Sequence, residues 1–127
     1  MALSHVTATR DAMANACVDR IDLGSADSAG DLEIMTSGDV EVSIHLCANP
    51  AFGASSSGTA TAAAIGDDTS AAGGTAALFQ FRDRDNGEVF RGTVTGIGGG
   101  GDIELDNVIV GVGVTVSITS FTYSASV

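Results

Sequence analysis

The sequence predicts a mainly β protein: an antiparallel β-sandwich or jelly-roll-like domain of seven or eight short strands with one N-terminal helix. Apolar and polar residues alternate with a period of two over most of the chain after residue 31, which is the pattern of half-buried strands. The 17 glycines, many beside Asn, Asp or Ser, divide these runs into short pieces. At 127 residues we expect a single domain over 1–127, with the helix within 1–22 and the β domain over 31–127.

The N-terminal helix is expected from about Ser4 to Arg20. Ser4 or Thr7 can cap its first turn, because short polar side chains accept hydrogen bonds from the exposed backbone amides of a helix start. Its narrow apolar stripe consists of Val6, Met13, Cys17 and Ile21. A helix with so little apolar surface is marginal alone, so we expect it to lie against the sheet or a neighbouring subunit.

The next strands are short. Leu32 and Ile34 mark the first strand, and Thr59 to Ile65 is expected to be an edge strand whose small residues specify its register weakly. Between them, the apolar positions of a longer strand are Val40, Val42, Ile44 and Leu46. The polar positions that we expect on its solvent face are Glu41, Ser43 and His45.

A hairpin is expected around Asn86 and Gly87, because this pair favours the two-residue type I′ turn. Such a turn sets Asp85 opposite Glu88 and places one set of apolar side chains on the core face. That set is Phe79, Phe81, Phe90 and Val94. The opposite face carries Gln80, Arg82, Arg84, Val89, Arg91 and Thr93.

Three of the five basic residues lie on that opposite face: Arg82, Arg84 and Arg91. The expected register sets Arg82 directly against Arg91, and like charges opposed across two strands are destabilising. Solvated arginines are one interpretation. The other is a partner-binding site, in which carboxylates of another subunit or protein pair with the guanidinium groups.

The last third of the chain contains a glycine-rich loop at 96–101 and two further regions of alternation. Ile103 and Leu105 alternate with Asp102, Glu104 and Asp106, a pattern typical of a strand with a solvated acidic face. A final strand begins at Val114. Its parity changes before Phe121, which predicts a β-bulge or a change of packing partner.

The charge and motifs exclude several function classes. A net charge of −11 disfavours binding to nucleic acid or to an anionic membrane. His5 and His45 have no ligand spacing around them, and segment 83–88 has its glycine and glutamate at the wrong offsets for a calcium loop. With no nucleophile elbow or phosphate-binding loop, we expect no enzyme, no catalytic residue, no metal and no cofactor.

Cysteine usage and the N-terminus indicate where the protein is made. Cys17 and Cys47 are too few to define a disulfide framework, and two reduced thiols are the favoured interpretation, with pairing left open. The N-terminal stretch has no basic segment followed by an apolar core, and no apolar run is long enough to span a membrane. We therefore expect synthesis in a cytoplasm.

Eight segments together resemble a group of small structural proteins of tailed bacteriophages. They are Asp19–Gly24, Gly30–Met35, Asn49–Gly53, Gly74–Ala77, Asp85–Gly87, Val89–Phe90, Gly92–Val94 and Gly113–Phe121. The chain is similar in size and composition to capsid decoration, or cement, proteins, which sit on assembled heads and are often trimers. The resemblance implies a virion protein on the capsid surface that stabilises the head by bridging subunits of the major capsid protein, with a homotrimer as the favoured assembly.

Two alternatives stay open. A tail, connector or fibre-associated component of the same kind of particle differs from a head protein in copy number. A receptor- or glycan-binding module, using Tyr123 or the acidic strand at 102–106, is weaker, because glycan sites usually carry stacked aromatic residues and this chain has no Trp.

Overall fold

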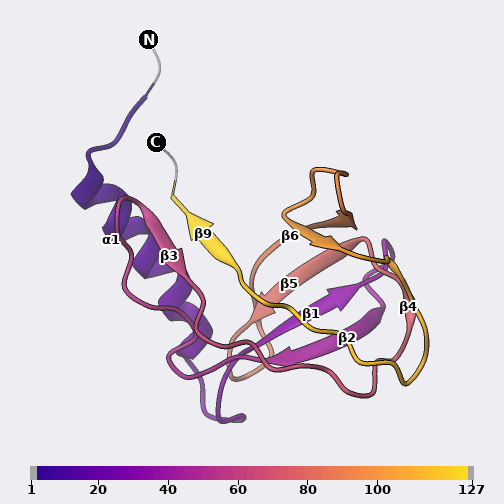
Figure 1. Cartoon of the computed structure of the whole chain (residues 1–127). Coiled ribbons are helices and arrows are strands. Elements are labelled where there is room, and N and C mark those ends of the chain that lie inside the picture. Colours follow the sequence, from indigo (N-terminus) through magenta and orange to yellow (C-terminus); the bar gives the residue numbers. More distant parts are fainter. Residues whose placement is uncertain (1–2, 126–127) are drawn as a thin grey trace.

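A computed structural model describes residues 3–125 and shows a mainly β fold with one N-terminal helix (Figure 1). The helical elements are α1 (Thr7–Val18) and the 3₁₀ turn η1 (Asp19–Asp22). The strands are β1 (Asp31–Met35), β2 (Glu41–Leu46), β3 (Thr59–Thr61), β4 (Gly74–Thr75), β5 (Leu78–Arg82), β6 (Glu88–Gly96), β7 (Ile103–Leu105), β8 (Ile109–Val110) and β9 (Thr122–Ser124). No helix within the described range is both long and apolar enough to cross a membrane.

The main sheet has five strands in the order β2-β1-β5-β6-β7. The first four pair antiparallel, whereas β6 and β7 run parallel, so the sheet is mixed rather than purely antiparallel. Two small sheets, β3-β9 and β4-β8, complete a sandwich-like fold. In Figure 1 the pair β3-β9 lies beside α1, on the opposite side of the molecule from β4.

The hairpin between β5 and β6 has a different register from the one expected. Phe81 pairs with Phe90 and Phe79 with Gly92, a shift of two residues, and Arg82 then pairs with Glu88 across an irregularity. The connection is a five-residue loop, 83–87, in which Asn86 alone has a left-handed φ of 64° among the non-glycine residues. A shift of two preserves the face of Phe79, Phe81, Phe90 and Val94, so the expected core face is still correct. Val89, expected on the opposite face, is the extra residue of the irregularity and packs against the core.

Strand β2 faces the opposite way from the prediction. Its register with β1 places Ser43 beside Ile34 and His45 beside Leu32, on the same face as the phenylalanines. Both polar residues are fully buried, whereas Leu46 is 55% exposed. Val42 is also buried, although the register between β1 and β2 shifts there and leaves it without a partner on β1.

The burial of Ser43 and His45 is possible because their polar atoms are satisfied. The Nδ1 atom of His45 donates to the carbonyl oxygen of Gly66 at 2.9 Å, and its Nε2 atom lies 2.9 Å from the Ser43 hydroxyl. Gly66 belongs to a segment that follows the outer edge of β2. The prediction that His45 is a surface side chain is therefore wrong.

The helix is shorter than expected, and of the expected apolar stripe only Ile21 is buried. It begins after Val6 without a side-chain cap, so neither Ser4 nor Thr7 has the expected role. Its buried residues are Ala14 and Val18, and Ile21 in η1 continues the same line. Val6 is 71% exposed, because α1 packs on β3 and β9 rather than on the main sheet.

The core is built around a cluster of phenylalanines. The ring of Phe121 lies 5.0–6.2 Å, centroid to centroid, from the rings of Phe52, Phe79, Phe81 and Phe90. Phe121 comes from the irregular segment 111–121, and its ring fixes that segment against the sheet. The strand expected from Val114 is not formed: residues 111–121 are irregular apart from a single bridge at Val116, and this irregular chain, rather than a bulge in a strand, accounts for the change of parity before Phe121.

The sheet curls and is nearly closed by chain segments that are not regular strands. Segment 66–73 is hydrogen-bonded to the outer edge of β2. The Gly66 amide donates to the Leu46 carbonyl, and the Gly73 amide donates to the Val42 carbonyl. The same segment pairs with the C-terminal chain, where Asp68 and Val116 exchange backbone hydrogen bonds. The remaining gap lies between β7 and segment 117–120.

Candidate partner-binding surface

Arg82 is held within the chain by Asp31 on the neighbouring strand. The two residues are opposed in the β1-β5 register, and their side chains form a bidentate pair. Nε lies 2.7 Å from Oδ1 and Nη2 lies 2.9 Å from Oδ2. The pair is mostly buried, with side-chain exposures of 17% for Arg82 and 11% for Asp31. The hydrogen bond to Asp31 raises the pKa of Arg82, although burial opposes this shift.

Arg91 and Arg84 also have partners in the chain. Arg91 Nη2 lies 2.6 Å from Glu88 Oε1, and its Nη1 lies 3.2 Å from Asp39 Oδ1. The hydrogen bonds to Glu88 and Asp39 raise the pKa of Arg91. Arg84 Nε donates to the carbonyl oxygen of Asp27 at 2.7 Å.

The reason for expecting a binding site at these arginines is therefore wrong. Arg82 does not oppose Arg91, because the register pairs Arg91 with Gln80. The face carries more acids than bases, with Asp31, Glu33, Asp39, Glu41 and Glu88 around Arg82 and Arg91. Binding of a partner by Arg82, Arg84 and Arg91 stays a prediction. Arg91, with 43% of its side chain exposed, is more accessible than Arg82, with 17%.

Asp83 and Asp85 of the 83–87 loop accept hydrogen bonds from backbone amides. Asp83 Oδ1 accepts from the amides of Asp85 and Gly87 at 2.9 and 2.8 Å. Asp85 Oδ1 accepts from the amides of Ser25 and Ala26, and these bonds lower the pKa of Asp85. Among residues 3–125, no three His, Cys, Asp or Glu side chains are placed to share a metal ion.

The two cysteines are separate free thiols. Burial, with Asp31 and Asp22 nearby, raises the pKa of Cys47 to about 12. Cys17 is half-buried and hydrogen-bonds Tyr123, which raises the pKa of Tyr123. Tyr123 is partly exposed, and its ring packs against Phe90 with 5.1 Å between the ring centroids.

Backbone groups without a hydrogen-bond partner in the described chain lie on both sides of the gap between β7 and segment 117–120. β7 is the last strand of the main sheet and pairs only on its β6 side within the described chain. For residues 117–120, likewise, the described part of the chain supplies no backbone hydrogen-bond partner. Neighbouring residues do have partners, because Val116 bonds Asp68 and the Phe121 carbonyl accepts from Ala62.

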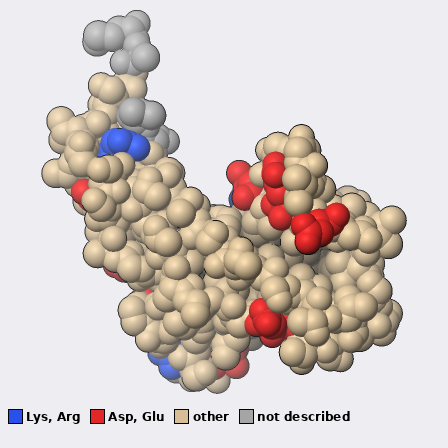
Figure 2. Space-filling model, viewed as in Figure 1, with Lys and Arg blue, Asp and Glu red and all other residues tan. Residues whose placement is uncertain are grey.

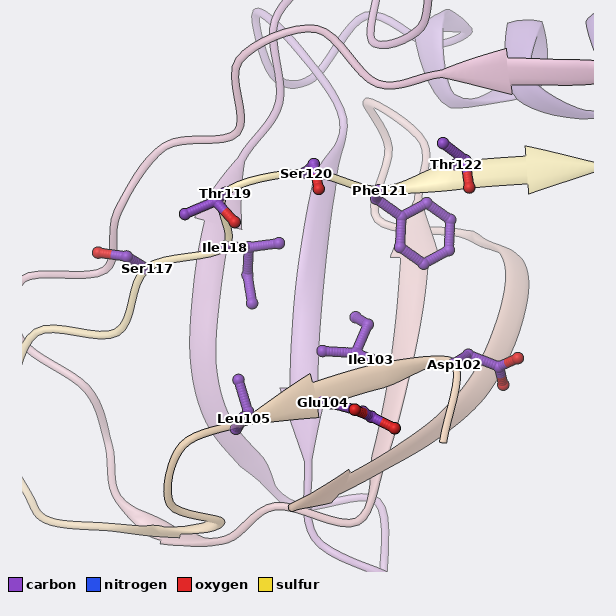
Figure 3. Close-up of a pocket in the computed structure, with 10 residues that line it drawn as sticks. All are labelled: Asp102, Ile103, Glu104, Leu105, Ser117, Ile118, Thr119, Ser120, Phe121 and Thr122. Atoms are coloured by element: carbon purple, nitrogen blue, oxygen red, sulfur yellow. The ribbon is translucent and has the colours of Figure 1, made fainter. Parts of the chain in front are cut away.

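A depression of about 360 Å³ separates the two segments (Figure 3). Four apolar side chains, which Figure 3 shows pointing into the space between them, form its floor: Ile103, Leu105, Ile118 and Phe121. The charged residues in its lining are Asp102 and Glu104. We call this depression, with β7 and segment 117–120 as its two walls, the seam.

Exposed aliphatic side chains continue the seam at one end. A second depression of about 360 Å³ adjoins it and shares Leu105 and Ser117 with it. Around this second depression, Ile109 is 70% and Val114 44% exposed, and nearby Val112 is 83% exposed. Such a group of exposed aliphatic residues is typical of a protein interface.

The seam was not predicted from the sequence, although residues 102–106 carry one signal for it. Ile103 and Leu105 were expected on a strand, and they lie on one. The acids at 102, 104 and 106 are also the device by which proteins protect an open sheet edge from uncontrolled pairing. Figure 2 shows acidic side chains gathered over the part of the molecule that β6, β7 and their connecting loop occupy.

Comparisons with known proteins give no relative: no family model, no curated protein and no solved structure matches this chain.

Proposed function

We propose that this protein is a structural component of a bacteriophage particle, a decoration or cement protein that binds the outside of the head. In this role it bridges subunits of the major capsid protein and adds interface area without a chemical step. The observation that carries the proposal is the seam, an unpaired sheet edge that adjoins exposed Ile109, Val112 and Val114. The likeness of the sequence to small phage structural proteins supplies the kind of particle.

Burial of the exposed aliphatic side chains by a neighbouring subunit would supply the binding energy for such a role. Aliphatic side chains that stay exposed in the single chain become stabilising when a neighbour covers them, at about 25 cal/mol for each Å² of apolar area buried. A component that is present in many copies multiplies a modest contact by symmetry. A homotrimer is the proposed assembly, and the region around Ile109 and Val112 is its proposed contact.

The test is the location and copy number of the protein in purified particles. A density map of the intact particle that shows this fold at repeated positions over the head supports the proposal. Matched particles made without the protein should rupture at a lower temperature or after milder chelation or salt treatment. A map that shows the protein only in a ring at the portal or tail would replace the proposal with the connector or tail alternative.

A further inference from the structure

We propose that the seam is a docking slot for one extended strand of a partner protein, in which aliphatic side chains alternate with basic ones. The strand pairs with the open edge of β7 and lies between β7 and segment 117–120. This inference deepens the proposed function by giving the chemistry of the partner segment, and it rests on that function only for the identity of the partner.

Backbone chemistry determines that the occupant is a strand. Alternate amides and carbonyls of β7 point away from β6, because a strand directs successive backbone groups to opposite edges. Across the depression, residues 117–120 have backbone groups without a partner inside the described chain. An extended peptide satisfies groups of this kind through main-chain hydrogen bonds, which is the mode of binding called β-augmentation.

Side-chain chemistry determines which strand fits. Ile103, Leu105, Ile118 and Phe121 line the floor and are 7–9% exposed, so inward-facing aliphatic side chains meet an apolar surface. The side chains that alternate with them face outward, towards the acidic rim. Asp102 and Glu104 lie on that rim, where their carboxylates also accept hydrogen bonds from the backbone of β6 and of the 97–101 loop. Asp106 follows at the end of the rim.

The same charges argue against a second copy of this chain as the occupant. An edge-to-edge pair would bring the acids of two β7 strands together, and like charges opposed across strands are destabilising. A basic strand, by contrast, is attracted to the rim.

A set of synthetic peptides tests the slot on the intact protein. The first is a nine-residue peptide that alternates Lys and Val; the second has the same composition in scrambled order; the third has Glu in place of each Lys. We expect amide shifts in NMR spectra at residues 103–105 and 117–120 with the alternating basic peptide. Binding of the scrambled and acidic peptides should be at least tenfold weaker, since they lose the pattern and the charge respectively.

Backbone pairing has its own control. Two further versions of the alternating peptide carry N-methyl groups on either the odd or the even amides, which blocks one edge of the strand in each case. At least one version should bind tenfold or more weakly, because two or three main-chain hydrogen bonds are lost. If both bind within twofold of the parent peptide, pairing with β7 is refuted.

A pair of charge variants locates the rim. Asp106→Asn should weaken binding of the basic peptide about two- to fivefold, the range of an exposed ion pair. Asp19→Asn makes the same change in net charge at the end of α1 and should leave binding unchanged. Equal effects of the two variants would show that only the net charge matters, which contradicts a defined slot.

The outcomes separate this inference from the proposed function. A particle map with the protein on the head and an empty seam refutes the slot and leaves the decoration role intact. Peptide binding at the seam by a protein that is missing from the head supports the slot and refutes the decoration role. A dimer in light scattering whose contact protects residues 103–105 from hydrogen exchange would make a second copy the occupant and overturn the inference.

Discussion

Replacement of Phe121 by Ala tests whether the C-terminal chain is an integral part of the core. The ring is 9% exposed and lies against the rings of Phe52, Phe79, Phe81 and Phe90. Truncation of a buried Phe costs about 3–5 kcal/mol, and a ring with this many aromatic neighbours lies towards the upper end of that range. We therefore expect the free energy of unfolding to fall by about 4 kcal/mol.

The measurement is a urea denaturation curve followed by circular dichroism. With an m-value of roughly 1.5 kcal/mol/M, a loss of about 4 kcal/mol lowers the midpoint by about 2.5 M. Phe121→Leu, which retains an apolar side chain, should lose only about 1.5 kcal/mol. Leu23→Ala, at a side chain that is 55% exposed, should change stability by no more than about 0.5 kcal/mol.

A loss below about 1 kcal/mol for Phe121→Ala would refute this reasoning. It would mean that segment 111–121 does not pack on the sheet in the isolated protein, and the wall of the seam would then not exist before a partner binds. Hydrogen exchange at Val116, which bonds Asp68 in both directions, gives an independent measure of the same point.

Three further changes test other contacts. Gly30→Ala should lower the free energy of unfolding by about 2–3 kcal/mol in urea denaturation, because a Cβ there would lie 2.4 Å from the Arg82 carbonyl oxygen. Gly96→Ala is the control: with open space around the added Cβ, it should lower the free energy of unfolding by less than about 1 kcal/mol. Arg82→Ala should lose about 2–3 kcal/mol, because it leaves the mostly buried Asp31 unpaired, and the double variant with Asp31→Asn should lose less than the sum. The raised pKa of Cys47 predicts pH dependence: the thiol ionises first in the unfolded chain, so stability is fully present below about pH 9 and falls as the pH rises towards 12. Cys47→Ala should flatten that decline, and an unchanged curve would assign the decline to other groups.

The fold class was predictable from the sequence because period-two alternation and glycine spacing are local signals. The core face of β5 and β6 was predictable even with the wrong turn, since a shift of two residues leaves Phe79, Phe81 and Phe90 on the same side. The turn itself was not, because the side chain of Asp83 accepts bonds from the loop amides and favours a longer loop than Asn86 and Gly87 alone would form.

The face of β2 was unpredictable for a different reason. Alternation identifies two faces but does not say which of them a distant segment will cover. His45 is buried because the carbonyl of Gly66 and the hydroxyl of Ser43 satisfy its ring, and neither contact leaves a trace in the local pattern. The seam was missed in the same way, since only the order of the strands reveals that β7 is an edge.

The tip of the β5-β6 hairpin ties together two parts of the chain that would otherwise meet through few bonds. The Asp85 carboxylate accepts hydrogen bonds from two amides of the linker between η1 and β1. The Asp27 amide donates to the carbonyl oxygen of Arg84, and Arg84 Nε donates to the carbonyl oxygen of Asp27. The Arg84 amide donates to the carbonyl oxygen of Leu23. The linker therefore cannot loosen without loss of these bonds, so the helical part and the main sheet should unfold as one cooperative unit. In the proposed role on the outside of a particle this property would limit proteolysis, because local opening is the step on which proteases act.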